Sequence, residues 1–222
     1  MFLEIDGVLT PEELQRLRSI GQAARFVEGR LSNPHNKTKN NLQIDHADPR
    51  YAEAAKIMAQ ALQRHEGFRN FASPRVVAPP MLAKYTPGMT YGLHTDAPFL
   101  PVGQRPLRSD LSCTLFIADP GDYEGGELAI QLGSRAVPFK GAAGSAIVYP
   151  STTLHEVTPV RSGERLVGLT FIESLIADSV LRELLYNLDE VAALEGLRMQ
   201  WDNRMRLDYV RSNLRRMWSE SV

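Results

Sequence analysis

The chain has 222 residues, of which 43% are hydrophobic and 23% are charged, and this length and composition suit one domain with a substantial core. Its 25 basic and 26 acidic residues nearly cancel, so there is no general electrostatic reason to expect nucleic acid or an anionic membrane as a partner. Cys113 is the single cysteine, so the fold does not depend on an internal disulfide or an oxidising compartment. We see no secretory signal and no apolar stretch of bilayer length, and we expect a cytoplasmic protein.

The N-terminal part of the chain predicts helices. Thr10-Pro11-Glu12-Glu13 supplies a capping residue, a proline suited to the first helical position and a glutamate that completes a capping box. A second helix is expected to begin at Asp48-Pro49 and to end near Gly67. Residues 2–8 are apolar at alternate positions and predict a short strand, whereas the polar segment 32–41 predicts a loop.

After Pro79-Pro80 the pattern becomes that of a β-protein. The clearest strand runs from Asp110 to Asp119, where apolar residues alternate with Ser112 and Thr114. Glycine and proline separate the short strands of this region, which are expected at residues 81–85, 91–96, 110–119, 127–130, 136–139, 145–149, 155–160 and 165–172. Short strands at this spacing favour a sandwich or a jelly-roll barrel.

The period returns to helical from about residue 176, with apolar faces in 180–188 and 205–218. The last helix is rich in arginine, which would suit an acidic partner. Such a pattern is more often the solvated face of a supporting helix, and we favour that interpretation. The expected organisation is one domain over residues 1–222, with a β-core at about 80–175, N-terminal helical support in 1–79 and C-terminal helices in 176–222.

A candidate metal site begins with His94 and Asp96, which stand two positions apart at the end of an expected strand and would point to the same side of it. His155 begins another strand, which a barrel can place beside the first. Two imidazoles and one carboxylate on one face leave three coordination positions open, the arrangement of non-haem Fe(II) oxygenases. Spacing alone leaves open that the three are unconnected polar residues. The remaining histidines are expected to be exposed or in a loop: His35, His46 and His65.

Arg165 begins an apolar strand ten positions after His155. Burying its charge without an anionic partner is costly, and its planar fork matches a carboxylate at two points. The strand position is compatible with an internal acidic partner or with exposure. The functional interpretation is an anchor for a dicarboxylate cosubstrate whose other end reaches the metal.

Further motifs accompany these residues in order and spacing: Lys39-Asn40-Asn41, Tyr91 to Asp96, Arg108 to Phe116, Asp119 to Leu128, Tyr149-Pro150-Ser151 and His155 to Arg165. With them, nearly the whole chain resembles an Fe(II)- and 2-oxoglutarate-dependent dioxygenase of the prolyl-hydroxylase-like group, and within it the bacterial PKHD-type hydroxylases. Several motifs that agree in this way are far more specific than any one of them.

The resemblance implies a mainly β fold with flanking helices and a double-stranded β-helix (jelly-roll) core. It implies that His94, Asp96 and His155 hold Fe(2+), and that Arg165 binds the distal carboxylate of 2-oxoglutarate. Tyr85 fits a tyrosine that helps to bind this carboxylate, although a buried tyrosine with a satisfied hydroxyl fits the position nearly as well. The implied reaction uses O2 to hydroxylate a C–H bond while 2-oxoglutarate is converted to succinate, with L-ascorbate as a reductant.

A second tyrosine of related hydroxylases has no counterpart, because Phe116 stands in its place, and Ser112 or Thr114 are candidates to compensate. Two other functions could use the same triad: a Zn-dependent hydrolase and a non-enzymatic cupin-like sensor or binding module. Arg165 argues against both, since neither needs a dicarboxylate anchor. The substrate is open between a prolyl or lysyl residue of a protein and a small molecule, and segments 32–41 and 97–109 are expected to line the entrance. The oligomeric state is also open.

Overall fold

The computed structural model describes residues 1–32 and 36–219. His35, with part of the predicted loop 32–41, therefore lies outside the described residues. Within the described ranges, no helix is long and apolar enough to cross a membrane.

Helix α1 (Pro11–Ala23) begins where the sequence predicts. The Thr10 backbone N–H donates to Glu13 Oε2 at 2.9 Å, and the Glu13 N–H donates to Thr10 Oγ1 at 3.2 Å, so the capping box is complete. The two bonds satisfy N–H groups that the first helical turn leaves without partners. Leu17 and Ile20 are buried on the inner face of the helix.

The second predicted helix is in fact two helices, α2 (Arg50–Arg64) and α3 (Glu66–Ala72). His65 between them has an extended backbone, with φ −76° and ψ 120°, and its N–H closes α2 by donating to the Ala61 and Leu62 carbonyls. The prediction that one helix ends near Gly67 was wrong. The break follows from tertiary packing, because it turns Phe68 and Phe71 of α3 into the core.

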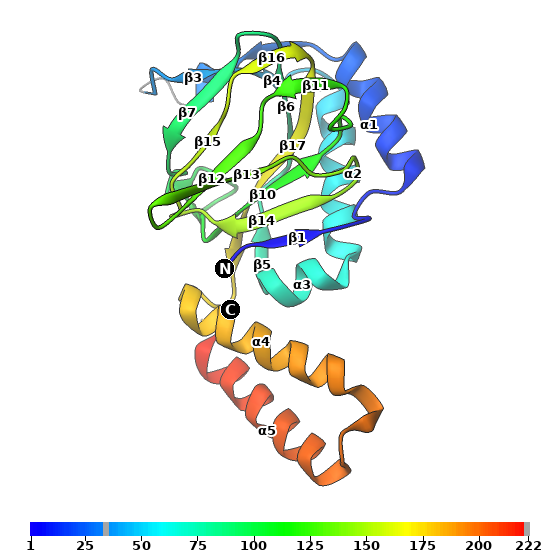
Figure 1. The fold of residues 1–222 in the computed structure, drawn as a ribbon, viewed down its shortest axis with the longest axis vertical. Coiled ribbons are helices and arrows are strands. Elements are labelled where there is room, and N and C mark those ends of the chain that lie inside the picture. The colour runs from blue at the N-terminus through cyan, green and yellow to red at the C-terminus, as the bar shows by residue number, and fades with distance from the viewer. Residues whose placement is uncertain (33–35, 220–222) are drawn as a thin grey trace.

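Two antiparallel sheets face each other in the β-core (Figure 1). Across the larger sheet the strands are β1 (Leu3–Ile5), β14 (Ala146–Pro150), β10 (Leu111–Phe116), β17 (Arg165–Ser174), β6 (Met81–Tyr85), β4 (Leu42–Ile44) and β2 (Phe26–Glu28), with β5 (Pro74–Val77) also paired to β17. Across the smaller sheet they are β13 (Arg135–Phe139), β12 (Leu128–Leu132), β15 (His155–Val157), β7 (Thr90–His94) and β3 (Lys39–Asn40). Two further strand pairs are β8 (Phe99–Leu100) with β9 (Leu107–Arg108), and β11 (Tyr123–Gly125) with β16 (Val160–Gly163).

Helices α1, α2 and α3 pack against the outer face of the larger sheet, where one core cluster contains Leu17, Met58, Phe68 and Leu115. Each such fully buried side chain contributes roughly 1.5–3 kcal/mol relative to an exposed one. Gly168 in β17 allows α2 to come this close, because a Cβ at that position would lie 2.3 Å from Met58 Sδ. The helices therefore cover the outer face of the larger sheet and bury its apolar side chains.

A second core cluster lies between the two sheets and includes Phe116, Ile147 and Val167 from the larger sheet and Ile130 and Val157 from the smaller one. Strand β10 serves both clusters, as its alternation predicts: its Leu111, Cys113 and Leu115 face the helices and its Phe116 faces the smaller sheet. The mainly β fold with flanking helices that the sequence predicts is confirmed.

The N-terminal region contributes more β-structure than the sequence predicts. β2 and β4 extend the larger sheet, β5 pairs with the end of β17, and β3 forms an edge of the smaller sheet. The prediction of a loop over 32–41 was thus wrong at Lys39–Asn40. Strands of two to four residues are too short to show a period, and their pairing with longer strands decides their conformation.

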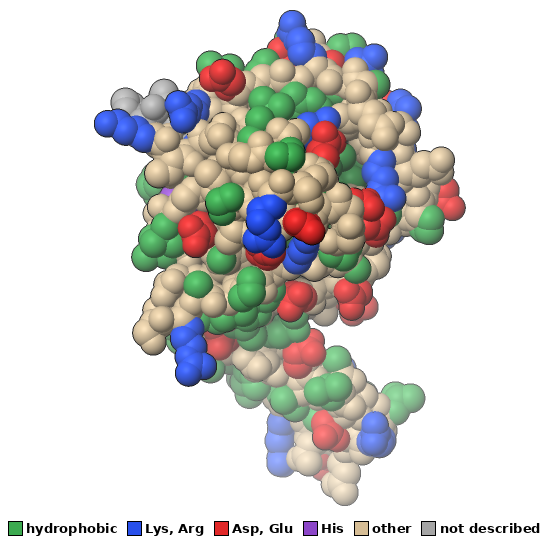
Figure 2. Space-filling view, turned by 45° about the horizontal axis from the view of Figure 1, so that its top comes forward, with side chains coloured by type: hydrophobic (Ala, Val, Ile, Leu, Met, Phe, Trp, Pro, Cys, Tyr) green, Lys and Arg blue, Asp and Glu red, His purple; other side chains and the backbone are tan. Residues whose placement is uncertain are grey.

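The chain ends in a helical hairpin, α4 (Ser179–Glu195) and α5 (Trp201–Trp218), which projects from the β-core in Figure 1. Short 3-10 turns occur at Gly29–Ser32 and, between these helices, at Gly196–Arg198. Arginines of α5 pair with acidic residues of the hairpin, as in Arg211–Asp189 at 2.6 Å and Arg215–Asp189 at 2.5 Å. These ion pairs offset arginine charge within the hairpin, which argues against a basic docking surface on α5. Figure 2 shows acidic and basic side chains interspersed on its face of the molecule.

Candidate metal centre

Two histidines face each other across neighbouring strands of the smaller sheet. β7 and β15 pair in antiparallel fashion, and His94 and His155 are direct Cα partners. Directly opposed residues project to the same side of a sheet, and the centroids of the two imidazole rings lie 4.3 Å apart. Strand pairing thus joins two residues that are far apart in the chain.

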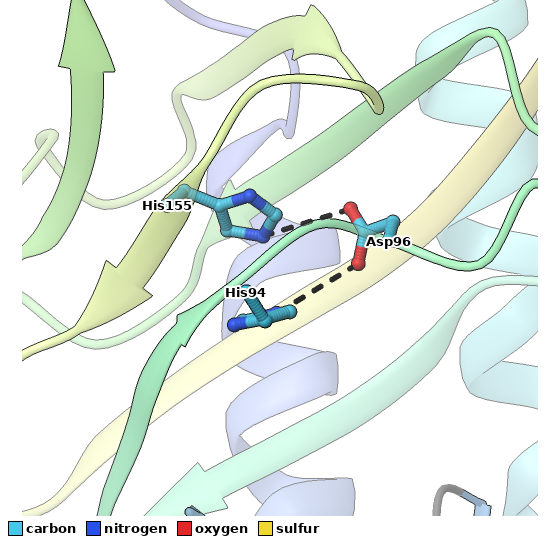
Figure 3. A group of neighbouring side chains, drawn as sticks. All are labelled: His94, Asp96 and His155. Carbon is cyan, nitrogen blue, oxygen red and sulfur yellow. Dashed lines mark ion pairs between the residues drawn. The ribbon is translucent and has the colours of Figure 1, made fainter. Parts of the chain in front are cut away.

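Asp96 completes the group from outside the strand, since β7 ends at His94. The Asp96 N–H donates to the Ser151 carbonyl at 3.2 Å, and Ser112 Oγ donates to Asp96 Oδ2 at 2.5 Å. Oδ1 then lies 3.9 Å from His94 Nε2 and Oδ2 lies 3.6 Å from His155 Nε2, as Figure 3 shows. The predicted convergence is present, but strand alternation does not cause it: bonds to β10 and to the turn after β14 direct Asp96 to the histidines.

Backbone carbonyls fix which imidazole nitrogens face the centre. His94 Nδ1 donates to the Gly92 carbonyl at 2.7 Å and His155 Nδ1 donates to the Thr153 carbonyl at 2.9 Å. In its neutral form, each ring therefore keeps a lone pair on Nε2. Burial, reinforced by the neighbouring His155, lowers the pKa of His94 below its ordinary value, so its ring is neutral at neutral pH. One ligand atom from each of the three residues lies within 4.8 Å of the others, and this donor set suits Fe(II).

A cavity of about 170 Å³ lies between the two sheets, with the three candidate ligands in its wall. The larger sheet contributes Arg165 and Thr114 to the lining, and the smaller sheet contributes Leu128 and Val157. Apolar side chains beside a few polar groups are typical of a small-molecule site. The cavity therefore extends from the candidate metal ligands to Arg165, the first residue of β17.

Arg165 is the largest fully buried side chain, with 1% of its surface exposed. It is the Cα partner of Tyr85, and its Cζ lies 5.0 Å from the centroid of the Tyr85 ring. Within the described part of the chain, its buried Nε and Nη1 have no hydrogen-bond partner. Exposure at the start of the strand, one alternative from the sequence, is therefore wrong. A buried guanidinium with unsatisfied donors fits an anionic acceptor such as a carboxylate.

Tyrosine side chains lie near this guanidinium and in the wall of the cavity beside it. Burial raises the pKa of Tyr85 to about 12, so its hydroxyl stays protonated and is able to donate. Burial raises the pKa of Tyr123, while the charge of Arg165 acts in the opposite direction. The ring centroid of Tyr149 lies 5.0 Å from that of His155. The sequence reasoning assigned no role to Tyr123 or Tyr149, although both stand in motifs that carry the family resemblance.

Lys39 is a second cavity residue that the sequence reasoning missed. It is the Cα partner of Tyr91, and its Nζ lies 5.2 Å from the centroid of the Tyr91 ring, which stacks on His94 at 3.6 Å. Burial lowers the pKa of Lys39, while the charge of Asp96 acts in the opposite direction. The Lys39-Asn40-Asn41 motif was the sequence feature that could have identified Lys39. The same three residues are also typical of a polar loop, so the motif alone did not point to the cavity.

The structure also shows the positions of the other residues that the sequence singled out. Phe116 packs between the sheets, as its position among the buried residues shows, and Ser112 bonds to Asp96 instead of supplying the hydroxyl of a missing tyrosine. Among the other described histidines, His46 stacks on Tyr51 at 4.3 Å and His65 joins α2 to α3. Ala97 and Leu100 of the segment 97–109 line the cavity.

Comparison with known proteins agrees with this geometry. Residues 80–173 match the family model of the 2OG-Fe(II) oxygenase superfamily. A PKHD-type hydroxylase of Sphingopyxis alaskensis is 49% identical over 211 residues, which cover 95% of this chain and 96% of the relative.

Two solved structures are similar in fold. One is a prolyl hydroxylase of Trichoplax adhaerens in complex with a hypoxia inducible factor peptide fragment, with a TM-score of 0.59, 18% identity and coverage of 77% of this chain and 83% of that one. The other is HygX from Streptomyces hygroscopicus with nickel and 2-oxoglutarate bound, with a TM-score of 0.53, 14% identity and coverage of 76% and 81%. These likenesses confirm the predicted jelly-roll core. Because the 49% identity with the Sphingopyxis relative extends over nearly the whole of both chains, this chain belongs to the PKHD-type hydroxylases of the 2OG-Fe(II) oxygenase superfamily and is a 2-oxoglutarate-dependent dioxygenase.

Proposed function

We propose that the enzyme hydroxylates a C–H bond of an organic substrate with O2 while 2-oxoglutarate is converted to succinate and CO2. His94, Asp96 and His155 would hold Fe(II), since they offer two imidazole nitrogens and a carboxylate within one small volume. When bound there, the metal supplies the redox chemistry that couples O2 to both organic molecules. L-ascorbate would keep the metal reduced.

The observation that carries the proposal is the buried Arg165. Its Nε and Nη1 are buried without a hydrogen-bond partner among the described residues, and the side chain lines the cavity. An unpaired buried charge is costly to maintain. A carboxylate would supply both the negative charge and an acceptor oxygen for this guanidinium. Since the cavity also reaches His94 and Asp96, a dicarboxylate fits, with one end on Arg165 and the other at the metal.

Neighbouring residues would orient the cosubstrate and exclude water. The protonated Tyr85 hydroxyl is able to donate to a carboxylate held by Arg165. Leu128, Val157 and Leu169 give the cavity apolar walls, which limit the access of bulk water to the reacting groups. A zinc hydrolase or a passive metal sensor has no use for a dicarboxylate anchor beside the metal ligands.

The substrate would enter past β3 and the segment 97–109, because Lys39, Ala97 and Leu100 line the cavity on that side. The solved prolyl hydroxylase that resembles this fold binds a peptide fragment, which supports a peptide as the first candidate.

The test is to search for the product in isotopically heavy O2. Purified enzyme with Fe(II), 2-oxoglutarate and ascorbate is incubated with fractionated cell extract, and mass spectrometry follows both peptides and metabolites. We expect a molecule that gains one heavy oxygen atom in step with succinate formation.

The control is the Asp96→Ala variant, which should give neither product. Succinate formation that is equal in Asp96→Ala would contradict the proposed site. Purified protein that contains zinc and produces no succinate in any fraction would contradict the proposed reaction.

A further inference from the structure

Three buried serines connect the Asp96 carboxylate to the protein interior. Ser112 Oγ lies 2.5 Å from Asp96 Oδ2 and 2.8 Å from Ser151 Oγ, and Ser109 Oγ lies 2.8 Å from Ser151 Oγ. The exposed fractions of Ser109, Ser112 and Ser151 are 6%, 3% and 2%. Four side chains from three separate segments thus form one continuous hydrogen-bonded chain.

The direction of every hydrogen bond in this chain follows from the number of available protons. A carboxylate only accepts, so Ser112 must donate its single hydroxyl proton to Asp96. Ser112 then has only lone pairs left for Ser151, so Ser151 donates to Ser112. The proton of Ser151 is now in use as well, and Ser109 therefore donates to Ser151, as its geometry allows. All three hydroxyls point their protons towards Asp96.

Aligned donors of this kind stabilise a negative charge at the end of the chain, because each bond polarises the next. The backbone supports the same arrangement: Asp96 N–H donates to the Ser151 carbonyl at 3.2 Å and Ser109 N–H donates to the Pro98 carbonyl at 2.9 Å. Asp96 has no regular strand around it, so these contacts take over the role of a strand in holding it.

We propose that Ser112, backed by Ser151 and Ser109, positions Asp96 as a metal ligand. Ser112 donates a charge-assisted hydrogen bond to Oδ2. This bond fixes the orientation of the carboxylate beside the two histidines. Ser112 is thus a positioning residue that acts through Asp96. The inference rests on the proposed metal site.

The test measures metal affinity without turnover. Metal-free wild-type protein and variants are titrated with Mn(II), whose free ion is followed by electron paramagnetic resonance. Ser112→Ala should bind Mn(II) roughly 10–100-fold more weakly, the usual cost of losing a hydrogen-bond partner of a metal ligand. Ser112→Thr keeps the hydroxyl and suits a strand, so its affinity should return towards that of the wild type. Ser151→Ala should fall between Ser112→Ala and the wild type.

The matched control is Ser145→Ala, which removes another buried serine hydroxyl, bonded only to the Ala142 carbonyl among the described residues. Thermal unfolding of the metal-free proteins separates loss of stability from loss of affinity. Equal affinities of Ser112→Ala and wild type, or equal losses in Ser112→Ala and Ser145→Ala, would overturn the inference. If the wild type itself fails to bind Mn(II) or Fe(II), the proposed metal site fails instead, so the two claims are tested separately.

Discussion

His155 and His94 are direct partners in the antiparallel pairing of β15 with β7, so backbone hydrogen bonds set the spacing of the two imidazoles. Catalytic groups on paired strands are held more firmly than groups on loops. Asp96 lacks this support and depends on side-chain and backbone bonds to the larger sheet. The candidate site therefore joins the two sheets.

Replacing His155 by alanine should abolish stoichiometric metal binding while the fold is retained, since the ring faces the cavity. Metal content after anaerobic loading with Fe(II) and desalting measures the effect. His46→Ala is the control, because this ring stacks on Tyr51 away from the cavity, and it should keep its full metal content. Full metal content in His155→Ala would exclude this residue as a ligand.

Arg165→Ala should raise the apparent Michaelis constant for 2-oxoglutarate much more than it changes metal affinity. The lost charge-assisted pair corresponds to roughly 2–5 kcal/mol. Arg165→Lys keeps the charge but loses the planar fork. We therefore expect its Michaelis constant for 2-oxoglutarate to lie between those of the wild type and Arg165→Ala. Arg182→Ala provides a control, because Arg182 is buried outside the cavity and donates to the Ile176 carbonyl. An unchanged constant in Arg165→Ala would show that the anchor lies elsewhere.

Tyr85→Phe should weaken 2-oxoglutarate binding by about 1.5–3 kcal/mol if its hydroxyl donates to the bound carboxylate. Calorimetric titration of Mn(II)-loaded enzyme with 2-oxoglutarate measures this without turnover. Tyr186→Phe, at a ring that packs on Phe71 outside the cavity, should leave the affinity unchanged. The same affinity in Tyr85→Phe and wild type would reduce Tyr85 to a packing role.

The metal-free protein should lose stability as the solution becomes acidic, in part through His94. The folded state lowers the pKa of this ring below its ordinary value of 6.5, so the unfolded chain binds more protons at acidic pH. Stability is therefore full above pH 6.5 and falls as the pH drops below it. Urea unfolding from neutral pH to about pH 5 should show a shallower loss for His94→Gln than for wild type. An equal loss of stability in His94→Gln and wild type would contradict the lowered pKa of His94.

Much of the β-core could be predicted from the sequence because its strands are long enough to alternate visibly, as between Leu111 and Phe116. The short strands β3 and β5 could not be, since two to four residues carry no period and only pairing makes them strands. The break at His65 could not be predicted either, because the residues on both sides of it favour a helix.

The candidate ligands were within reach of sequence reasoning, whereas their supports were not. His94, Asp96 and His155 are residue types with metal chemistry, and Arg165 is out of place in an apolar strand. The role of Ser112 depends on a contact across 16 positions of the chain, which no local pattern records. Strand alternation put Ser112 and Thr114 on the same face of the strand but did not identify the partner of Ser112.

The most direct test of the central claim is anomalous diffraction at the iron absorption edge from crystals grown without oxygen in Fe(II) and 2-oxoglutarate. We expect one iron atom bound by His94 Nε2, Asp96 and His155 Nε2, and a 2-oxoglutarate molecule whose distal carboxylate contacts Arg165. Iron at any other position, or 2-oxoglutarate bound away from Arg165, would contradict it.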